Sequence, residues 1–174
     1  MSAWRRELLG PMRQLGYVVG DAEAGAHQWV ERFGIGPWRV IHGIGFDSCV
    51  YRGQAIELAI SIASAYSNGV EIELIAQDDG PRSMYTDHLE RHGPGVQHAC
   101  FFPRDYDQAR AHLLDSGMEP VLDGAIAETR FCYLEDAAGQ LIEIADVSAD
   151  GIAAREARGA AADGWDGANP VRVA

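Results

Sequence analysis

Residues 13–34, RQLGYVVGDAEAGAHQWVERFG, combine two local patterns that recur later in the chain. The first seven residues form a β-strand pattern, and Asp21 then stands where the N-cap of a helix is expected. The apolar residues that follow recur every three or four positions, which is the spacing of one helix face. They are Ala22, Ala26, Trp29, Val30 and Phe33. This stretch therefore predicts a strand followed by an amphipathic helix.

Residues 96–117, VQHACFFPRDYDQARAHLLDSG, repeat the same arrangement. Asp105 takes the place of Asp21 at a distance of 84 residues (105 − 21), and Gly117 takes the place of Gly34 at a distance of 83 (117 − 34). An offset that stays nearly constant through a strand, a helix and a turn indicates a duplicated unit.

Three strand-like runs follow each predicted helix, so each unit reads β-α-β-β-β. From Pro37 to Glu73 the first unit uses 36 residues, whereas the second uses 23 from Pro120 to Glu143, which leaves about 13 extra residues (36 − 23) in the first unit. We place them in the Gly-rich loop at residues 43–54. The runs cover residues 37–45, 55–63 and 70–76 in the first half and 120–126, 129–135 and 141–147 in the second.

Two such units predict an α+β fold in which tandem βαβββ modules form an eight-stranded sheet. One helix covers one face of each module, so the other face is left to curve around a cleft. We place the domain at residues 11–147, with the first module at about 11–80 and the second at about 95–147. Residues 148–174, rich in Ala, Gly and Asp, are expected to form a C-terminal extension that is partly helical or disordered.

The composition restricts the classes of partner. The 174 residues are 47% hydrophobic and carry a net charge of −12, which would repel a nucleic acid backbone or an anionic membrane surface. No apolar run reaches the ~20 residues of a membrane-spanning helix, and the first residues lack the apolar stretch of a signal peptide. Cys49, Cys100 and Cys132 show no CxxC spacing, so we expect small core residues in a cytoplasmic protein.

Polar residues at equivalent strand positions of the two units define a candidate metal site. The first strands offer Gln14 and His98, and the last strands offer Glu73 and Glu143, each acid flanked by aliphatic residues that would face a helix. One imidazole, two carboxylates and an amide oxygen suit an octahedral divalent ion with positions left for water or substrate. Glu143 in particular lies between two isoleucines, where a carboxylate needs a partner or a metal.

Simpler interpretations exist for these residues. The acids of VEIELIAQ, residues 70–77, would also suit a solvated edge strand, and a lone His98 would suit a hydrogen-bonded core position. Glu71 shares the strand side of Glu73, and we interpret it as a residue behind or at the rim of the site.

Other polar or aromatic residues are expected to lie outside the metal site. His42, His88 and His92 fall in loop or linker sequence, where solvated histidines are the rule, and Trp38 is expected to pack in the core. Arg130 and Tyr133 differ in strand parity, so only one of the two can face the cleft, and the sequence leaves open which one.

Four stretches, taken in order, resemble the vicinal oxygen chelate superfamily, which includes glyoxalase I, methylmalonyl-CoA epimerase, extradiol dioxygenases and bleomycin-resistance proteins. They are QLGYVVGDAEAGAHQWVERFGIGPW, VEIELIAQ, GPGVQHACFF and LEDAAGQLIEIAD, which together span roughly residues 13–147. The surroundings GIGPW, GPGVQH and ELIAQDDGP are similar to the glyoxalase and methylmalonyl-CoA epimerase-like branch. The resemblance implies the glyoxalase/bleomycin resistance/dioxygenase fold, and the family's metal positions fall on Gln14, Glu73, His98 and Glu143.

This resemblance implies a metal-dependent isomerase, epimerase or lyase that acts on a small oxygenated substrate through an enolate-type intermediate. The cofactor would be one divalent ion among Zn, Ni, Co, Mn and Mg, and Glu143 and Glu73 would serve as base and acid. The alternative is a metal-free small-molecule binding or sequestering protein of the resistance type. A ring-cleaving dioxygenase is less favoured, because Gln14 stands in place of a histidine ligand. Family members that complete their sites across a dimer imply a homodimer.

Overall fold

The first βαβββ module forms one half of a curved sheet. This computed structural model describes residues 8–174, within which the module's strands lie side by side in the order β2-β5-β6-β1. The elements are β1 (Met12–Val18), α2 (Ala22–Phe33), β2 (Trp38–Gly45), β5 (Ala59–Ser67) and β6 (Val70–Asp79).

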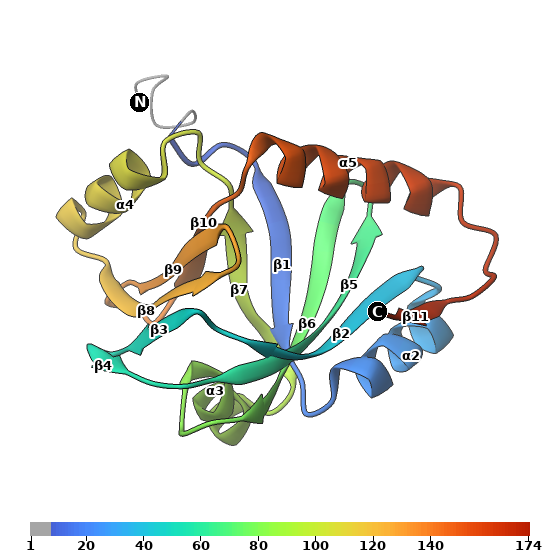
Figure 1. The fold of residues 1–174 in the computed structure, drawn as a ribbon, viewed down its shortest axis with the longest axis horizontal. Helices are drawn as coiled ribbons and strands as arrows, with labels where there is room; N and C mark the ends of the chain where they lie inside the picture. The colour runs from blue at the N-terminus through green and yellow to red at the C-terminus, as the bar shows by residue number, and fades with distance from the viewer. Residues whose placement is uncertain (1–7) are drawn as a thin grey trace.

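The second module repeats this arrangement with the strand order β7-β10-β9-β8. Its elements are β7 (Gly95–Phe101), α4 (Tyr106–Asp115), β8 (Glu119–Ile126), β9 (Thr129–Glu135) and β10 (Leu141–Asp146). The two modules join where β1 pairs with β7 in antiparallel fashion, so the first strands of both units lie at the centre of one continuous sheet (Figure 1). The predicted α+β fold with duplicated modules is confirmed.

The signals that start and end the two module helices act as the sequence predicted. The Asp21 side chain accepts a hydrogen bond from the backbone N–H of Ala24 at 2.9 Å, and Asp105 does the same for Gln108 at 2.9 Å. Gly34 ends α2 with a φ of 65°, a left-handed conformation that favours glycine. Local sequence therefore fixes both helices at equivalent places in the repeat.

Within residues 8–174, three further strands and two further helices lie outside the two predicted βαβββ units. The inserted loop forms the hairpin β3 (Ser48–Tyr51) and β4 (Gln54–Ala55), and β3 pairs with β8 at the far edge of the second module. The segment between the modules contains α3 (Met84–His92), whose N-cap Ser83 forms a capping box with Thr86. The sheet therefore has 11 strands, because the insertion and the C-terminus extend the eight that duplication provides.

The C-terminal extension folds back on the first module. It begins with α5 (Ala149–Asp163), which agrees with the expected helical part, but its end is ordered as β11 (Val171–Val173). The expectation of disorder there is wrong, because β11 pairs with the edge strand β2 in parallel and gains backbone hydrogen bonds. In Figure 1 α5 runs across one end of the central strands, and α3 lies at the opposite end.

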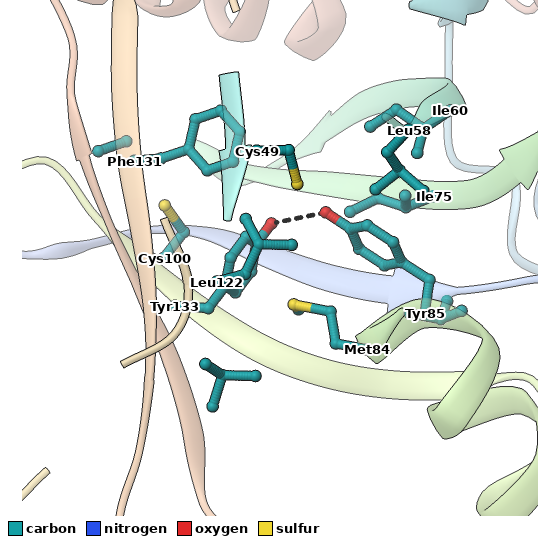
Figure 2. Close-up of a cluster of buried hydrophobic side chains, with 13 residues drawn as sticks. Cys49, Leu58, Ile60, Ile75, Met84, Tyr85, Cys100, Leu122, Phe131 and Tyr133 are labelled. Carbon is teal, nitrogen blue, oxygen red and sulfur yellow. Dashed lines mark hydrogen bonds between the residues drawn. The ribbon is translucent and has the colours of Figure 1, made fainter. Parts of the chain in front are cut away.

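Apolar side chains fill both faces of the sheet. Helix α2 buries Ala22 and Ala26 against the outer face of the first module, and α4 buries Tyr106 and Leu113 against that of the second. Trp38 is fully buried in the first of these clusters, so it packs in the core as expected. A third cluster fills much of the concave face (Figure 2). Within residues 8–174, no helix has the length and apolar character needed to span a membrane.

Candidate active site

All four predicted metal-site residues project from the four central strands of the sheet. Their strands are neighbours in the order β6-β1-β7-β10, and they carry Glu73, Gln14, His98 and Glu143 respectively. A cavity of about 130 Å³ opens on the concave face, and Gln14, Glu73 and Glu143 are among its lining residues. One chain therefore supplies all four residues, two from each module.

His98 and Glu143 lie in contact within this group. The imidazole Nε2 lies 3.2 Å from the carboxylate Oε2, and the two side chains are 0% and 9% exposed. Both atoms are buried, and neither makes a hydrogen bond within the described residues. Buried polar atoms are rarely left without a partner, so this facing pair needs a proton or a cation between its two atoms.

Gly16 makes room for the His98 ring. It pairs with His98 across the β1–β7 junction, and a Cβ atom at this position would lie 2.0 Å from the imidazole Cε1. On its other side the ring meets Tyr133 edge to face, with ring centroids 4.9 Å apart. The Nδ1 atom lies 3.3 Å from Oε1 of Gln97. Neighbours on several sides therefore fix the orientation of the imidazole.

Glu73 lies beside this pair and is half-buried, with its remaining exposure at the cavity wall. Burial raises the pKa of its carboxyl well above the ordinary value, and the nearby Glu143 and Glu71 raise this pKa further. Arg155 and a hydrogen bond from Gln14 act in the opposite direction but do not cancel these effects. The surroundings of Glu73 therefore favour its protonated form, or a cation beside it, relative to an exposed glutamate.

Glu71 is buried behind the cavity and is paired with an arginine from the C-terminal helix. Its side chain is 6% exposed, and its Oε2 accepts a hydrogen bond from Nε of Arg155 at 3.3 Å. The guanidinium carbon of Arg155 lies 5.3 Å from the centroid of the Phe102 ring. Helix α5 thereby places one cation at the wall of an acidic cavity.

Two buried tyrosines form part of the cavity wall opposite the first module. The hydroxyls of Tyr85 and Tyr133 point toward one another at 3.5 Å (Figure 2), and burial raises the pKa of both. Tyr133 thus faces the cavity, whereas Arg130 points outward and donates to Asp146 at 2.6 Å. The structure resolves the choice that the sequence left open between these two residues.

The other histidines lie away from this cavity. His42 lies in β2 rather than in a loop; its side chain is half-exposed, and its two ring nitrogens lie 3.0 Å from Ser61 and Glu23. His88 and His92 stack on α3 with centroids 5.2 Å apart and line a different cavity of about 110 Å³. None of the three lines the cavity that holds the acids.

The four side chains are of the chemical types that bind divalent ions, and the distance between His98 and Glu143 also suits a bound ion. An imidazole nitrogen and a carboxylate oxygen 3.2 Å apart, both without hydrogen bonds, are spaced as two ligands of one ion would be. Against this, no three His, Cys, Asp or Glu side chains among residues 8–174 form a group close enough to hold a metal. A metal bound by His98 and Glu143 would therefore have to take its remaining ligands from another type of group, such as the amide of Gln14 or water.

Sequence reasoning missed Gly16, Tyr85 and Arg155. A glycine inside a strand is a known sign of close approach by another group, and Gly16 carried that signal. Tyr85 belongs to helix α3 in the segment between the two modules, and Arg155 belongs to helix α5 in the C-terminal extension, and neither segment is part of the predicted repeat. Only the tertiary structure brings these two side chains to the cavity.

The family comparison agrees with this architecture. The sequence model of the Glyoxalase/Bleomycin resistance protein/Dioxygenase superfamily matches residues 13–133, more than half of the chain. The chain therefore belongs to this superfamily. The comparison with curated proteins finds no match.

Several solved structures share the fold at low sequence identity. Methylmalonyl-CoA epimerase from Mycobacterium tuberculosis is 21% identical with a TM-score of 0.58, over 88% of this chain and 96% of that one. A methylmalonyl-CoA epimerase in complex with methylmalonyl-CoA and NH4+ is 21% identical with a TM-score of 0.51, over 81% and 96%. A Streptomyces coelicolor methylmalonyl-CoA epimerase variant in complex with 2-nitronate-propionyl-CoA is 22% identical with a TM-score of 0.51, over 81% and 96%. At these identities the similarity establishes the fold.

Proposed function

We propose that this protein is a metal-dependent isomerase, epimerase or lyase that moves a proton at a carbon next to a carbonyl group of a small oxygenated substrate. The observation that carries the proposal is the facing pair of His98 Nε2 and Glu143 Oε2, neither of which makes a hydrogen bond within residues 8–174, with a second carboxyl at Glu73 in the cavity that Glu143 also lines. A buried acid pair beside an imidazole is the combination that binds cations and transfers protons.

Gln14, Glu73, His98 and Glu143 are the residues that would hold the ion, which we place among Zn, Ni, Co, Mn and Mg. When bound, a divalent ion would supply positive charge beside the substrate oxygens and so acidify the neighbouring C–H. The carboxyls would carry the proton. We assign Glu143 as the base and Glu73 as the acid, because burial and nearby acids raise the pKa of Glu73 and favour its protonated form.

The epimerase neighbours support this reaction class in a general way. An epimerase must remove a proton on one face of a carbon and return one on the other, which requires two proton-transferring groups. Glu143 and Glu73 come from opposite modules of the sheet and could serve two faces of one substrate. Because the neighbours are methylmalonyl-CoA epimerases, acyl-CoA thioesters are the first substrates to test, followed by hemithioacetals, hydroxyketones and catechols.

The alternative function is metal-free binding of a small molecule. It is favoured by the finding that no three His, Cys, Asp or Glu side chains of residues 8–174 are grouped as metal ligands. In that case the acids would form the polar wall of a binding pocket. Ring cleavage remains the least favoured reaction, since Gln14 stands where such enzymes use histidine. For either function we place the protein in the cytoplasm, as a homodimer.

Elemental analysis of the purified protein tests the metal directly, together with thermal unfolding before and after a chelator. We expect a bound divalent ion, a lower melting temperature after chelation, and recovery when one of the five candidate ions is added. His98→Ala should abolish the recovery, whereas the matched control His42→Ala, outside the cavity, should retain it. No bound metal together with no stabilisation by any of these ions would favour the binding protein.

A further inference from the structure

Helix α5 contributes one charged side chain to the candidate active site. Among residues 8–174, Arg155 is the only cationic side chain that lines the 130 Å³ cavity, whose wall also contains Glu73 and Glu143. The helix lies outside the region matched by the superfamily, which ends at residue 133. Arg155 therefore comes from the C-terminal extension, beyond the region that the superfamily model matches.

The guanidinium is held in place but keeps donors for a ligand. Its Nε donates to Glu71 and its Nη1 donates to the carbonyl oxygen of Gly151 at 3.4 Å, while the ring of Phe102 supports it at 5.3 Å. Within the part of the chain that the structure describes, the hydrogen bonds of Arg155 thus leave Nη2 unused. A planar guanidinium with a fixed orientation is well suited to bind a carboxylate through its remaining N–H groups.

A second cavity adjoins the first at this residue. It has a volume of about 260 Å³, and Arg155 and Phe102 belong to the walls of both cavities. Arg13 also lines it, and the buried Nε of Arg13 has no hydrogen-bond partner among the described residues. An ion pair between Arg155 and Glu71 alone would explain neither this cavity nor the unpartnered Nε of Arg13, whose Nη1 is paired with Glu156 at 3.4 Å.

We propose that Arg155 is a specificity-determining residue and binds a carboxylate of the substrate, so that the substrate is a small organic acid or an acyl ester with a free carboxylate. The carboxylate would lie between the two cavities, with the reacting carbon toward Glu143. The inference deepens the proposed function and rests on it for this orientation. A phosphate is less suitable, because its larger charge would be repelled by the surrounding acids.

Isothermal titration calorimetry with malonate tests the inference on the full chain loaded with Co²⁺. Wild type, Arg155→Met and the matched control Arg158→Met are compared. Arg158 lies on the same helix and over an aromatic ring, that of Tyr66 at 6.0 Å, but lines a different cavity. Direct contact of malonate with the metal is common to all three proteins, so the difference between them reports Arg155.

We expect Arg155→Met to weaken malonate binding at least tenfold and Arg158→Met to change it less than twofold. Glu71→Gln should tighten malonate binding severalfold, because it removes a competing negative charge beside the guanidinium. If Arg155→Met fails to fold, Arg155→Lys serves instead, with an expected loss of several-fold because the ammonium lacks the planar fork. Neutral malonamide should not compete with malonate.

Equal malonate affinity in Arg155→Met and wild type, no malonate binding at all, or tighter binding of inorganic phosphate than of malonate would overturn the inference. The same titration on the metal-free protein separates the inference from the proposed function. Arg155-dependent malonate binding by a protein that takes up no metal would contradict the metal-dependent reaction and leave the carboxylate site in place. Metal uptake with Arg155-independent binding would contradict the carboxylate site alone.

Discussion

Replacement of Gly16 by alanine should displace the His98 imidazole. The new Cβ would lie 2.0 Å from Cε1 and 2.2 Å from Nε2, whereas ordinary contacts begin at 3.4 Å. The ring must therefore move by about 1.4 Å (3.4 − 2.0) or the two central strands must separate. Metal–ligand distances tolerate only about 0.2 Å, so a shift of this size removes His98 as a ligand.

This displacement should change both the free energy of unfolding and the metal affinity. Overpacking of a well-packed interior costs about 1–3 kcal/mol, so Gly16→Ala should lower the free energy of unfolding by that amount. Disturbing even the neighbours of a metal ligand costs about 10–100-fold in affinity, and loss of the ligand itself should cost at least about 100-fold, or roughly 2.7 kcal/mol. Urea unfolding measures the first effect, and calorimetric titration with Co²⁺ measures the second.

Gly45→Ala is the matched control, because Gly45 is also a strand residue and nothing lies within 4 Å of its added Cβ. A double-mutant cycle with His98→Ala sharpens the test. Once the imidazole is gone, Gly16→Ala should cost little further stability. If instead the costs of Gly16→Ala and His98→Ala simply add, the reasoning that Gly16 exists to make room for the ring is refuted.

Three further predictions concern catalysis, the thiols and the core. Glu143→Gln should retain part of the metal binding but lower turnover by two or more decades, about 3 kcal/mol. Glu73→Gln should lower turnover less. If Glu143→Gln turns over substrate at the wild-type rate, Glu143 is not the base. Burial raises the pKa of Cys49 to about 11 and that of Cys132 to about 12, which leaves little thiolate at pH 8. Ellman's reagent should therefore label the native protein far more slowly than the protein in urea. Rapid labelling without denaturant would contradict this prediction. Trp38→Ala should destabilise the fold by about 3–5 kcal/mol in urea unfolding, and a loss below 1 kcal/mol would show that this cluster carries little of the stability.

Local and repeated features made the fold predictable from the sequence. The N-caps Asp21 and Asp105 act through hydrogen bonds to residues three positions away, so the sequence alone contains both partners. The constant offset between the units then predicted that the strands of Gln14 and His98 are equivalent, and the structure places them next to each other.

Features that depend on distant pairing were not predictable in the same way. The outward side of Arg130 and the inward side of Tyr133 follow from the register of β9 against β10, which no local pattern encodes. Likewise, β11 exists because β2 offers an edge more than a hundred residues earlier, and Arg155 contacts Glu71 across 84 positions of sequence. The composition of the extension resembled a disordered tail because its partners lie elsewhere in the chain.

A two-residue connection between β2 and β3 links the two modules near opposite ends of the strand order. β2 lies near one end of the strand order and β3 near the other, yet only Phe46 and Asp47 separate them in the chain. Asp47 bonds to the second module through Ala125 and Ala127, at 2.9 and 2.7 Å. The short β2–β3 connection and the pairing of β3 with β8 thus hold the two sides of the curved sheet together. The two sides cannot move apart unless β3 separates from β8.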